Sequence, residues 1–277
     1  MRVAGREVDA ASVLPFRFDG RRLTGLAGDT IASALLAAGE RVVGRSFKYH
    51  RPRGLWGAWT EEPNAIVSVR LNGVAIPNCL ATTTPLEAGM EVRSVNAWPS
   101  ARFDLKGGLD LMQRWLPAGF YYKTFMRPDW HLFEPSIRRM AGLGALHGAV
   151  PEGYRSDQSF ETCDLLVVGA GPAGLMAARA AAEAGQAVLL VDDRARPGGL
   201  GRIEAQIDGR PAKTWIDDQM TAIRAAGARV LSRATAFAIH DGPIVAVAES
   251  GAFGTPPGCG GYGRGGSFLP LGPSTAR

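Results

Sequence analysis

The sequence predicts a chain of mixed class, in which an α+β unit is followed by an α/β unit. Two observations support this prediction. In the first hundred residues, strand patterns that turn at Asp19-Gly20 and Asn72-Gly73 surround one short helical pattern. From residue 165 on, an apolar strand, an alanine-rich helix and a second apolar strand follow one another in the order of a βαβ unit.

The elements of the first unit follow from local patterns. Val13–Phe18 and Arg21–Leu26 alternate as two strands of a hairpin. Asp29 and Thr30 can cap a helix that carries its apolar residues on one face, and Gly39 supplies its end. Three further strands are predicted at Ile66–Leu71, Val74–Ile76 and Met90–Val95. A hairpin, a helix and further strands favour a β-grasp domain over residues 1–100.

Residues 101–160 differ from this unit in being rich in large aromatic side chains. A disordered linker would lack such residues, because they need to bury substantial area. We expect an ordered connection that wraps over neighbouring domains or a partner subunit, with ordinary packing inside one domain as the alternative. The aromatic residues are Trp115, Phe120, Tyr121, Tyr122, Phe125, Trp130 and Phe133.

A G-x-G-x-x-G motif lies between the first apolar strand, Leu165–Val168, and the alanine-rich helix. It consists of Gly169, Gly171 and Gly174, with Pro172 and Ala173 between the last two. The first glycine permits a tight turn, the second lets the backbone approach a pyrophosphate, and the third lets the helix pack closely on the sheet. The phosphate charge would lie at the positive end of the helix. This context predicts that the chain binds a dinucleotide.

The second apolar strand, Val188–Val191, ends at an acidic residue. Asp192 can accept hydrogen bonds from ribose hydroxyls, and Asp193 takes this role if the strand register is shifted by one residue. A negative charge there would disfavour a 2′-phosphate, so NAD or FAD fits better than NADP. The pair Gly198 and Gly199 is most common in flavoprotein-type domains, which also accept NAD. The pattern alone leaves these two cofactors open.

The rest of the chain divides into residues 161–250 and 251–277. The first range is predicted to be an incomplete Rossmann-like dinucleotide-binding domain. After its glycine pair we expect a hairpin at Asp208-Gly209, a helix over Trp215–Ala226, and strands at Arg229–Ser232 and Ile244–Ala248. The second range is rich in glycine and proline and shows no amphipathic period, which predicts a disordered or aberrant tail.

Composition and charge exclude several classes of protein. The 277 residues are 46% hydrophobic and 21% charged, and no apolar run approaches the roughly 20 residues that span a bilayer, so no membrane partner is expected. The first residues lack the apolar core of a signal peptide. Cys79, Cys163 and Cys259 are too far apart in sequence for a disulfide framework or a close metal-ligand pair. These features predict a cytoplasmic protein without a metal site.

The net charge of +5 raises the possibility of a nucleic-acid partner. Arg45–Arg53 is the densest basic segment and has aromatic residues interleaved. We favour a solvated or interdomain loop, because short basic runs are common and nothing else indicates a nucleic-acid module. No nucleic-acid partner is therefore expected.

The sequence assigns no catalytic residues. Its four histidines are isolated from one another, and it contains neither a nucleophile elbow nor His/Cys spacing suited to zinc. Each histidine is interpreted as a surface or packing residue. The chain can thus bind a redox cofactor without carrying the reacting site. The histidines are His50, His131, His147 and His240.

Several segments together resemble the N-terminal part of the alpha subunit of heterotetrameric sarcosine oxidase. The basic and aromatic string followed by Glu-Glu-Pro-Asn is quite specific to this family and its amine-dehydrogenase relatives. The resemblance continues through the aromatic connection and the glycine motif to about Asp241. The segments are Gly44–Gly54, Glu61–Ala65, Pro77–Asn78, Ala81–Thr82 and Asn96–Ser100.

This resemblance implies that the β-grasp domain is a clusterless version of a 2Fe–2S ferredoxin-like domain. Related proteins hold a cluster there through cysteines, whereas Cys79 alone cannot bind one. The resemblance also implies that the dinucleotide is NAD, with FAD as the alternative. We therefore expect NAD and no iron–sulfur cluster in this chain. Flavins and oxidative chemistry would belong mainly to the beta subunit and its interface.

The function implied by the resemblance is that of a subunit fragment in an amine oxidoreductase complex. The complex would oxidise sarcosine to glycine and reduce oxygen to hydrogen peroxide, with the methyl carbon passed to tetrahydrofolate or released as formaldehyde. Its beta and other subunits would be the partners, and this chain would be inactive alone. Two alternatives are a non-catalytic assembly or nucleotide-binding module and a self-sufficient FAD-dependent oxidoreductase.

Family members continue through the rest of the dinucleotide domain and then a folate-binding half. This chain instead enters the Gly/Pro-rich stretch near Gly251. The abrupt loss of periodicity leads to the hypothesis of a truncated or frame-shifted product.

Overall fold

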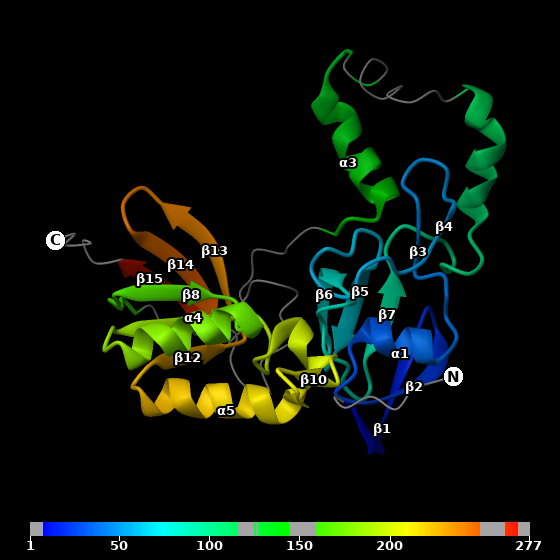
Figure 1. The fold of residues 1–277 in the computed structure, drawn as a ribbon. Coiled ribbons are helices and arrows are strands. Elements are labelled where there is room, and N and C mark those ends of the chain that lie inside the picture. Colours follow the sequence, from blue (N-terminus) through cyan, green and yellow to red (C-terminus); the bar gives the residue numbers. More distant parts are fainter. Residues whose placement is uncertain (1–7, 116–124, 126, 145–158, 250–263, 271–277) are drawn as a thin grey trace. The chain divides into compact units, whose positions relative to one another are not determined.

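A computed structural model of the chain describes residues 8–115, 125, 127–144, 159–249 and 264–270 (Figure 1). The chain divides into two compact units, whose main parts are Met1–Val150 and Pro151–Thr255. The first unit contains one cluster of buried apolar side chains, and the second contains two.

The first unit is built on a five-stranded sheet with the strand order β2-β1-β7-β5-β6. The central pair β1 and β7 is parallel, and the other neighbours are antiparallel. One helix and a two-stranded ribbon, β3 with β4, complete the domain. The predicted β-grasp arrangement is confirmed. The elements are β1 Asp9–Phe18, β2 Arg21–Ala27, α1 Ile31–Ala37, β3 Gly44–Arg45, β4 Pro52–Arg53, β5 Ile66–Leu71, β6 Val74–Leu80 and β7 Glu91–Ser94.

The start of α1 is fixed by the residues that the sequence predicts. Thr30 is the N-cap, and its hydroxyl accepts the Ser33 N–H at 3.2 Å while the Ser33 hydroxyl accepts the Thr30 N–H at 3.0 Å. Asp29 accepts hydrogen bonds from the Ser33 hydroxyl and from the Leu26 N–H, both at 2.7 Å. These bonds join the end of β2 to the start of the helix.

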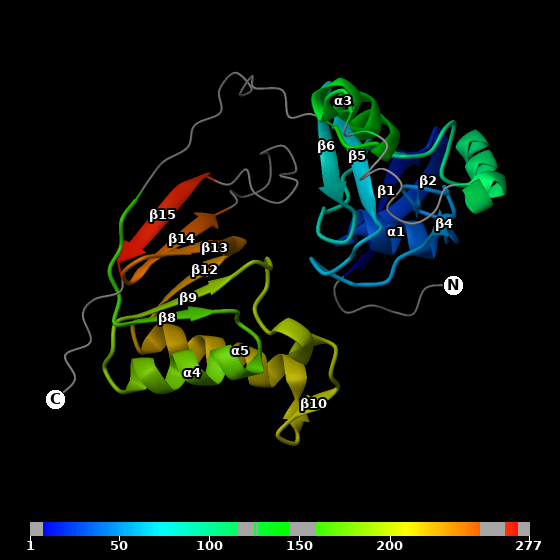
Figure 2. The same ribbon diagram turned by 90° about the horizontal axis from the view of Figure 1, so that it is seen from above.

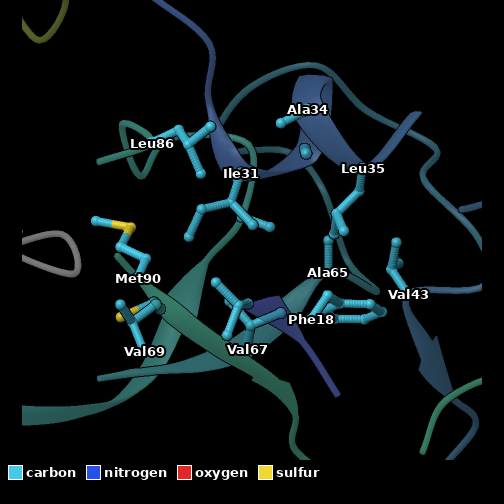
Figure 3. Packing of buried hydrophobic residues seen from close by; sticks show 14 of the residues in the cluster. Phe18, Ile31, Ala34, Leu35, Val43, Ala65, Val67, Val69, Leu86 and Met90 are labelled. Carbon is cyan, nitrogen blue, oxygen red and sulfur yellow. The ribbon is translucent and has the colours of Figure 1, made fainter. Parts of the chain in front are cut away.

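The core of this unit lies between α1 and the sheet. Figure 3 shows Ile31 and Leu35 of the helix on one side, with Phe18, Val67 and Val69 of the strands on the other. All five side chains are buried. Removing such apolar side chains from water stabilises the domain.

The aromatic-rich connection contains a 3-10 helix, η1 (Leu105–Trp115), and an α-helix, α3 (Trp130–Ala141). Phe125 and Phe133 form a tilted ring pair with centroids 5.2 Å apart. The predicted aromatic residues Phe120, Tyr121 and Tyr122 lie outside the described residues. After α3, the Gly144 N–H donates to the Asn78 side chain at 3.0 Å and the Asn78 amide donates back to the Gly144 carbonyl at 2.9 Å.

The second unit has three layers. Its centre is a parallel sheet of three strands in the order β12-β9-β8. Figure 2 shows α4 and α5 on one face of this sheet and the strands β13, β14 and β15 on the other. The predicted Rossmann-like arrangement is confirmed. The elements are β8 Leu165–Val168, α4 Pro172–Glu183, β9 Val188–Asp192, η2 Gly199–Arg202, β10 Gln206–Ile207, β11 Arg210–Pro211, α5 Ala212–Ala225, β12 Arg229–Ser232, β13 Ala234–His240, β14 Ile244–Glu249 and β15 Arg264–Pro270.

The structure differs from the predicted tail at one place. Within residues 251–277, Arg264–Pro270 forms β15, which pairs antiparallel with β14. The bonds of a strand ladder are made by the backbone, so an exposed neighbouring strand can recruit a segment without amphipathic pattern. Residues 251–263 and 271–277 lie outside the described residues.

Candidate dinucleotide site

The glycine motif lies at the junction between β8 and α4, where the sequence predicts it. Gly169 directly follows β8, has a φ of +98°, and donates its N–H to the Val191 carbonyl of β9 at 2.7 Å. Gly171 is the N-cap of α4, and Pro172 is the first helical residue. The chain therefore turns sharply from the C-terminal end of a strand into the N-terminus of a helix, as in dinucleotide-binding domains.

Gly171 and Gly174 differ in the space around them. A Cβ atom at Gly174 would lie 1.8 Å from the Gly169 carbonyl oxygen, so only glycine lets the helix pack this closely on the turn. A Cβ atom at Gly171 would have no heavy atom within 4 Å. The space in front of Gly171 is thus open, and a ligand can approach the backbone there.

A second glycine loop lies against the first. The Gly198 N–H donates to the Ala170 carbonyl at 2.7 Å, and a Cβ atom at Gly199 would lie 2.9 Å from the Gly171 Cα. Gly198 also has a φ of +119°, a conformation that side chains rarely allow. The two predicted glycine groups are therefore brought together at one end of the sheet.

Asp192 holds the first glycine loop and the start of the segment that follows β9. Its carboxylate is buried at the end of β9, where one oxygen accepts the Ala170 N–H at 2.6 Å and the other accepts the Arg194 N–H at 2.8 Å. The sequence did not predict these two hydrogen bonds, because a backbone N–H group can belong to almost any residue type and leaves no pattern of side chains. Each carboxylate oxygen keeps a further lone pair for another donor. Asp193, the alternative, is exposed beside it.

The start of α4 offers donors to an anion. The first intrahelical hydrogen bond runs from the Leu175 N–H to the Gly171 carbonyl at 2.9 Å, so the N–H groups of Ala173 and Gly174 precede it. No side chain caps the helix at Gly171, and its first turn contains no acidic residue. Backbone dipoles at this end favour negative charge.

Other candidate chemical groups lie elsewhere. Burial raises the pKa of the Cys163 thiol, and the nearby Asp164 carboxylate raises it further. A raised pKa keeps the thiol neutral, so Cys163 is a poor nucleophile. His50 hydrogen-bonds Asp104, whereas His147 lies outside the described residues. Within the described ranges, no three or more His, Cys, Asp or Glu side chains are grouped to hold a metal ion.

Comparison with protein families defines the class of each unit. Residues 11–97 match a family described as "2Fe-2S iron-sulfur cluster binding domain", and residues 164–226 match "FAD dependent oxidoreductase". The second match contains both glycine loops and Asp192. The chain thus joins a ferredoxin-like domain to an FAD-dependent oxidoreductase region. Among the described helices, none has both the length and the apolar character needed to span a membrane.

The resemblance to the alpha subunit of sarcosine oxidase is confirmed. The chain is 50% identical over 248 residues to sarcosine oxidase subunit alpha of Rhizobium meliloti (strain 1021), an alignment covering 87% of this chain and 25% of that protein. It is 34% identical over 248 residues to the subunit of the same name from Corynebacterium sp. (strain P-1), covering 87% and 21%. The chain therefore spans about a quarter of the length of these curated relatives.

A solved structure supports the fold. L-proline dehydrogenase from P. horikoshii superposes with a TM-score of 0.54 over 94% of this chain and 39% of its own, at 14% sequence identity. At this identity the likeness shows the fold alone.

These matches correct the expected cofactors. The expectation of NAD is wrong, and FAD, the alternative, agrees with the family that residues 164–226 match. A glycine turn and an acidic residue of this kind are suited to the parts that both dinucleotides share, so the pattern could not separate the two. The expectation of no iron–sulfur cluster is contradicted by the match of residues 11–97 to a cluster-binding family. That expectation followed from the number of cysteines. A cysteine count shows whether cluster ligands are present, but it does not show to which family the domain is related.

The described residues fit the two groups differently. The opening at Gly171, between the start of α4 and the second glycine loop, suits the pyrophosphate of FAD. Cys79 is the one cysteine in residues 11–97, whereas a 2Fe–2S cluster takes four ligands. The side chains that the structure describes do not supply such a ligand set. We therefore derive no chemistry from a cluster.

Proposed function

We propose that this chain is a subunit of a sarcosine oxidase-like amine oxidoreductase and that its second unit binds FAD. The observation that carries the proposal is the opening at Gly171, which has the start of α4 on one side and the second glycine loop on the other. The residues proposed to bind the cofactor are Gly169, Gly171, Pro172, Ala173, Gly174, Asp192, Asp193, Gly198 and Gly199.

The chain's own groups would bind and orient the cofactor. The N–H groups of Ala173 and Gly174, together with the dipole of α4, would hold the pyrophosphate charge. Asp192 would accept the ribose hydroxyls with its remaining lone pairs, while its bond to Ala170 keeps the first loop in place. Asp193 is the exposed alternative for the ribose contact.

FAD, when bound, accepts two electrons from a substrate and passes them to an acceptor such as oxygen. In the proposed complex, sarcosine, oxygen and water would give glycine, formaldehyde and hydrogen peroxide, or the methyl carbon would pass to tetrahydrofolate. The beta and other subunits would be partners, and this chain alone would show little turnover. The proposal draws support from the relatives named as sarcosine oxidase subunits.

The Gly171→Ala variant tests the FAD site directly. The added methyl group meets no atom of the chain, so the second unit should keep its fold. The methyl group would occupy the space that the pyrophosphate needs, so we expect FAD affinity to fall about tenfold or more, which is about 1.4 kcal/mol. Titration of the cofactor-free protein with FAD, followed by flavin fluorescence, measures the dissociation constant.

Gly107→Ala is the matched control. Gly107 lies in η1, and a Cβ atom there also has no heavy atom within 4 Å. This variant should bind FAD like the unmodified chain. Equal FAD affinity for Gly171→Ala and Gly107→Ala would show that the Gly171 opening is not part of the cofactor site.

The dependence on other subunits is tested separately. Sarcosine turnover by the purified chain without other subunits would contradict the assignment as a dependent subunit.

A further inference from the structure

One surface of the first unit combines exposed aromatic and basic side chains on a rigid base. It consists of the tip of the ribbon β3–β4, residues 46–51, and the turn formed by residues 98–105. We refer to these two segments as the hairpin surface. Both views place the ribbon next to η1, which begins at Leu105 (Figures 1 and 2). Neither segment contributes to the proposed FAD site.

Arg45 joins the two segments. Its guanidinium donates to the Ala101 carbonyl at 2.7 Å, to the Arg102 carbonyl at 3.0 Å and to the His50 carbonyl at 3.1 Å. Ala101 and Arg102 are more than fifty positions from Arg45 in the sequence, whereas His50 is close to it. A charged donor that satisfies three carbonyl groups holds the ribbon and the turn in one arrangement.

A buried pair below the surface completes the connection. His50 Nδ1 lies 2.7 Å from Asp104 Oδ2, and the two side chains are 1% and 0% exposed. The other oxygen of Asp104 accepts the N–H groups of Trp98 at 3.0 Å and of Lys106 at 3.2 Å. The turn is therefore held around one carboxylate, and the residues that it presents have fixed positions.

Large apolar side chains of both segments are exposed. Phe103 is 64% exposed, Trp98 60%, Leu105 56% and Phe47 42%. Aromatic side chains held outward by a rigid base lose little conformational entropy when a partner covers them. Such clusters mark interaction sites more often than single exposed apolar residues do.

Basic residues accompany the apolar ones. Lys48 and Arg51 lie over the ring of Tyr49, at 4.8 and 5.0 Å from its centroid, and Arg51 also pairs with Asp110. Arg53 and Arg102 are exposed nearby. The one acidic residue of the turn, Asp104, is buried against His50. The exposed charge of the hairpin surface is therefore positive.

We infer that the hairpin surface docks another protein subunit whose contact patch is apolar at its centre and acidic at its rim. This inference rests on the proposed function, which places the chain in a complex. Tryptophan, phenylalanine and arginine are enriched in protein interfaces and supply much of their binding energy. A protein partner is favoured over a single-stranded nucleic acid, because Leu105 adds exposed apolar area without a stacking face and Arg51 is already paired with Asp110.

The test uses the full chain and, as the probe, the beta subunit of the Rhizobium meliloti sarcosine oxidase. Phe103→Ala combined with Arg102→Glu removes one aromatic contact and reverses one charge, and neither side chain takes part in the Arg45 and Asp104 bonds. Isothermal titration calorimetry at low salt measures binding. We expect the dissociation constant to rise about tenfold or more in the double variant.

The matched control is Phe237→Ala combined with Arg224→Glu in the second unit. Phe237 on β13 is 59% exposed, close to the value of Phe103, and Arg224 is an exposed residue of α5. This control should bind the probe like the unmodified chain. Failure of the unmodified chain to bind, or an equal loss in both double variants, would overturn the inference.

Two further measurements separate the possible outcomes. A single-stranded DNA of about 20 nucleotides replaces the subunit in a parallel titration, and tight binding that the Phe103/Arg102 variant loses would make the surface a nucleic-acid site instead. The FAD content of every variant is recorded as well. It should remain unchanged, so a failure of the FAD proposal would be seen independently of the docking result.

Discussion

Gly171 and Gly174 belong to one motif, but the structure gives them opposite constraints. The first faces open space, whereas the second touches the carbonyl of Gly169. A motif read from sequence treats both as invariant features of a phosphate loop. The structure thus separates Gly174, which the fold requires, from Gly171, which only a bound ligand would require.

Replacement of Gly174 by alanine should therefore destabilise the second unit itself. A Cβ atom 1.8 Å from a backbone oxygen forces the helix away from the turn, because neither partner is a flexible side chain. We expect a loss of about 4 kcal/mol or more in the free energy of unfolding. Urea denaturation followed by circular dichroism measures it. Gly171→Ala serves as the comparison, and equal stability of the two variants would show that the close packing is not needed.

Asp192 shows how much of a single residue's role the sequence leaves open. Its place at the end of a strand predicts a contact to ribose. The structure adds that the same carboxylate is buried and binds the N–H groups of Ala170 and Arg194. These contacts involve backbone atoms, which are identical in every residue type except proline. No side-chain pattern could have indicated them.

At the scale of elements, local chemistry predicted the turns well. Asp19-Gly20, Asn72-Gly73 and Asp208-Gly209 all have positive φ at both residues, between +46° and +83°. Two-residue hairpin turns need this conformation, and Asp, Asn and Gly adopt it most easily. The helix start at Thr30 was also predicted, because a cap depends on residues close in sequence.

Elements that depend on distant partners were not predicted. β13 is rich in alanine, and β15 contains adjacent glycines, so local composition is a weak signal for both strands. Both lie beside β14, and the ladder of backbone hydrogen bonds defines them. The ribbon β3–β4 similarly depends on Arg45 and on a buried pair between His50 and Asp104. Bonds across fifty or more positions leave no local signal.

The His50–Asp104 pair should contribute strongly to the stability of the first unit. Asp104→Ala leaves His50 Nδ1 buried without its partner and removes the acceptor of two backbone N–H groups, so we expect a loss of about 3 kcal/mol. Asp110→Ala is the control, because its pair with Arg51 is exposed and should contribute below about 1 kcal/mol. Urea denaturation of both variants compares them. Equal losses would mean that burial of the pair adds no stability.

At the scale of the whole molecule, each unit has its own core. Leu35 lies in the core of the first unit and Ile223 in that of the second, and both side chains are fully buried. Truncation of either residue to alanine creates a cavity that costs about 2–5 kcal/mol. If the cores are independent, each truncation should weaken only its own unit.

Hydrogen exchange read by mass spectrometry tests this independence. Leu35→Ala should reduce protection in peptides of β5 and β7 and leave β9 unchanged, whereas Ile223→Ala should do the reverse. FAD affinity should survive the first change and fall with the second. Loss of protection in both units from either truncation would show that the chain folds as one cooperative body.

The choice between NAD and FAD also depends on more of the molecule than the glycine motif. In the proposed site, the glycine loops and Asp192 would contact the pyrophosphate and ribose that both cofactors contain. The parts that differ, nicotinamide and flavin, lie outside the reach of this motif. The match of residues 164–226 to a family of FAD-dependent oxidoreductases favours FAD, which the motif alone could not do.

The most direct test of the account is to identify the dinucleotide that the purified chain retains. The protein is incubated with equal excess concentrations of FAD and NAD, desalted and denatured, and the released molecule is identified by mass spectrometry. We predict that FAD is released from the unmodified chain and from Gly107→Ala, and that little is released from Gly171→Ala. Release of NAD in preference to FAD, or of neither dinucleotide, would contradict the proposed cofactor site.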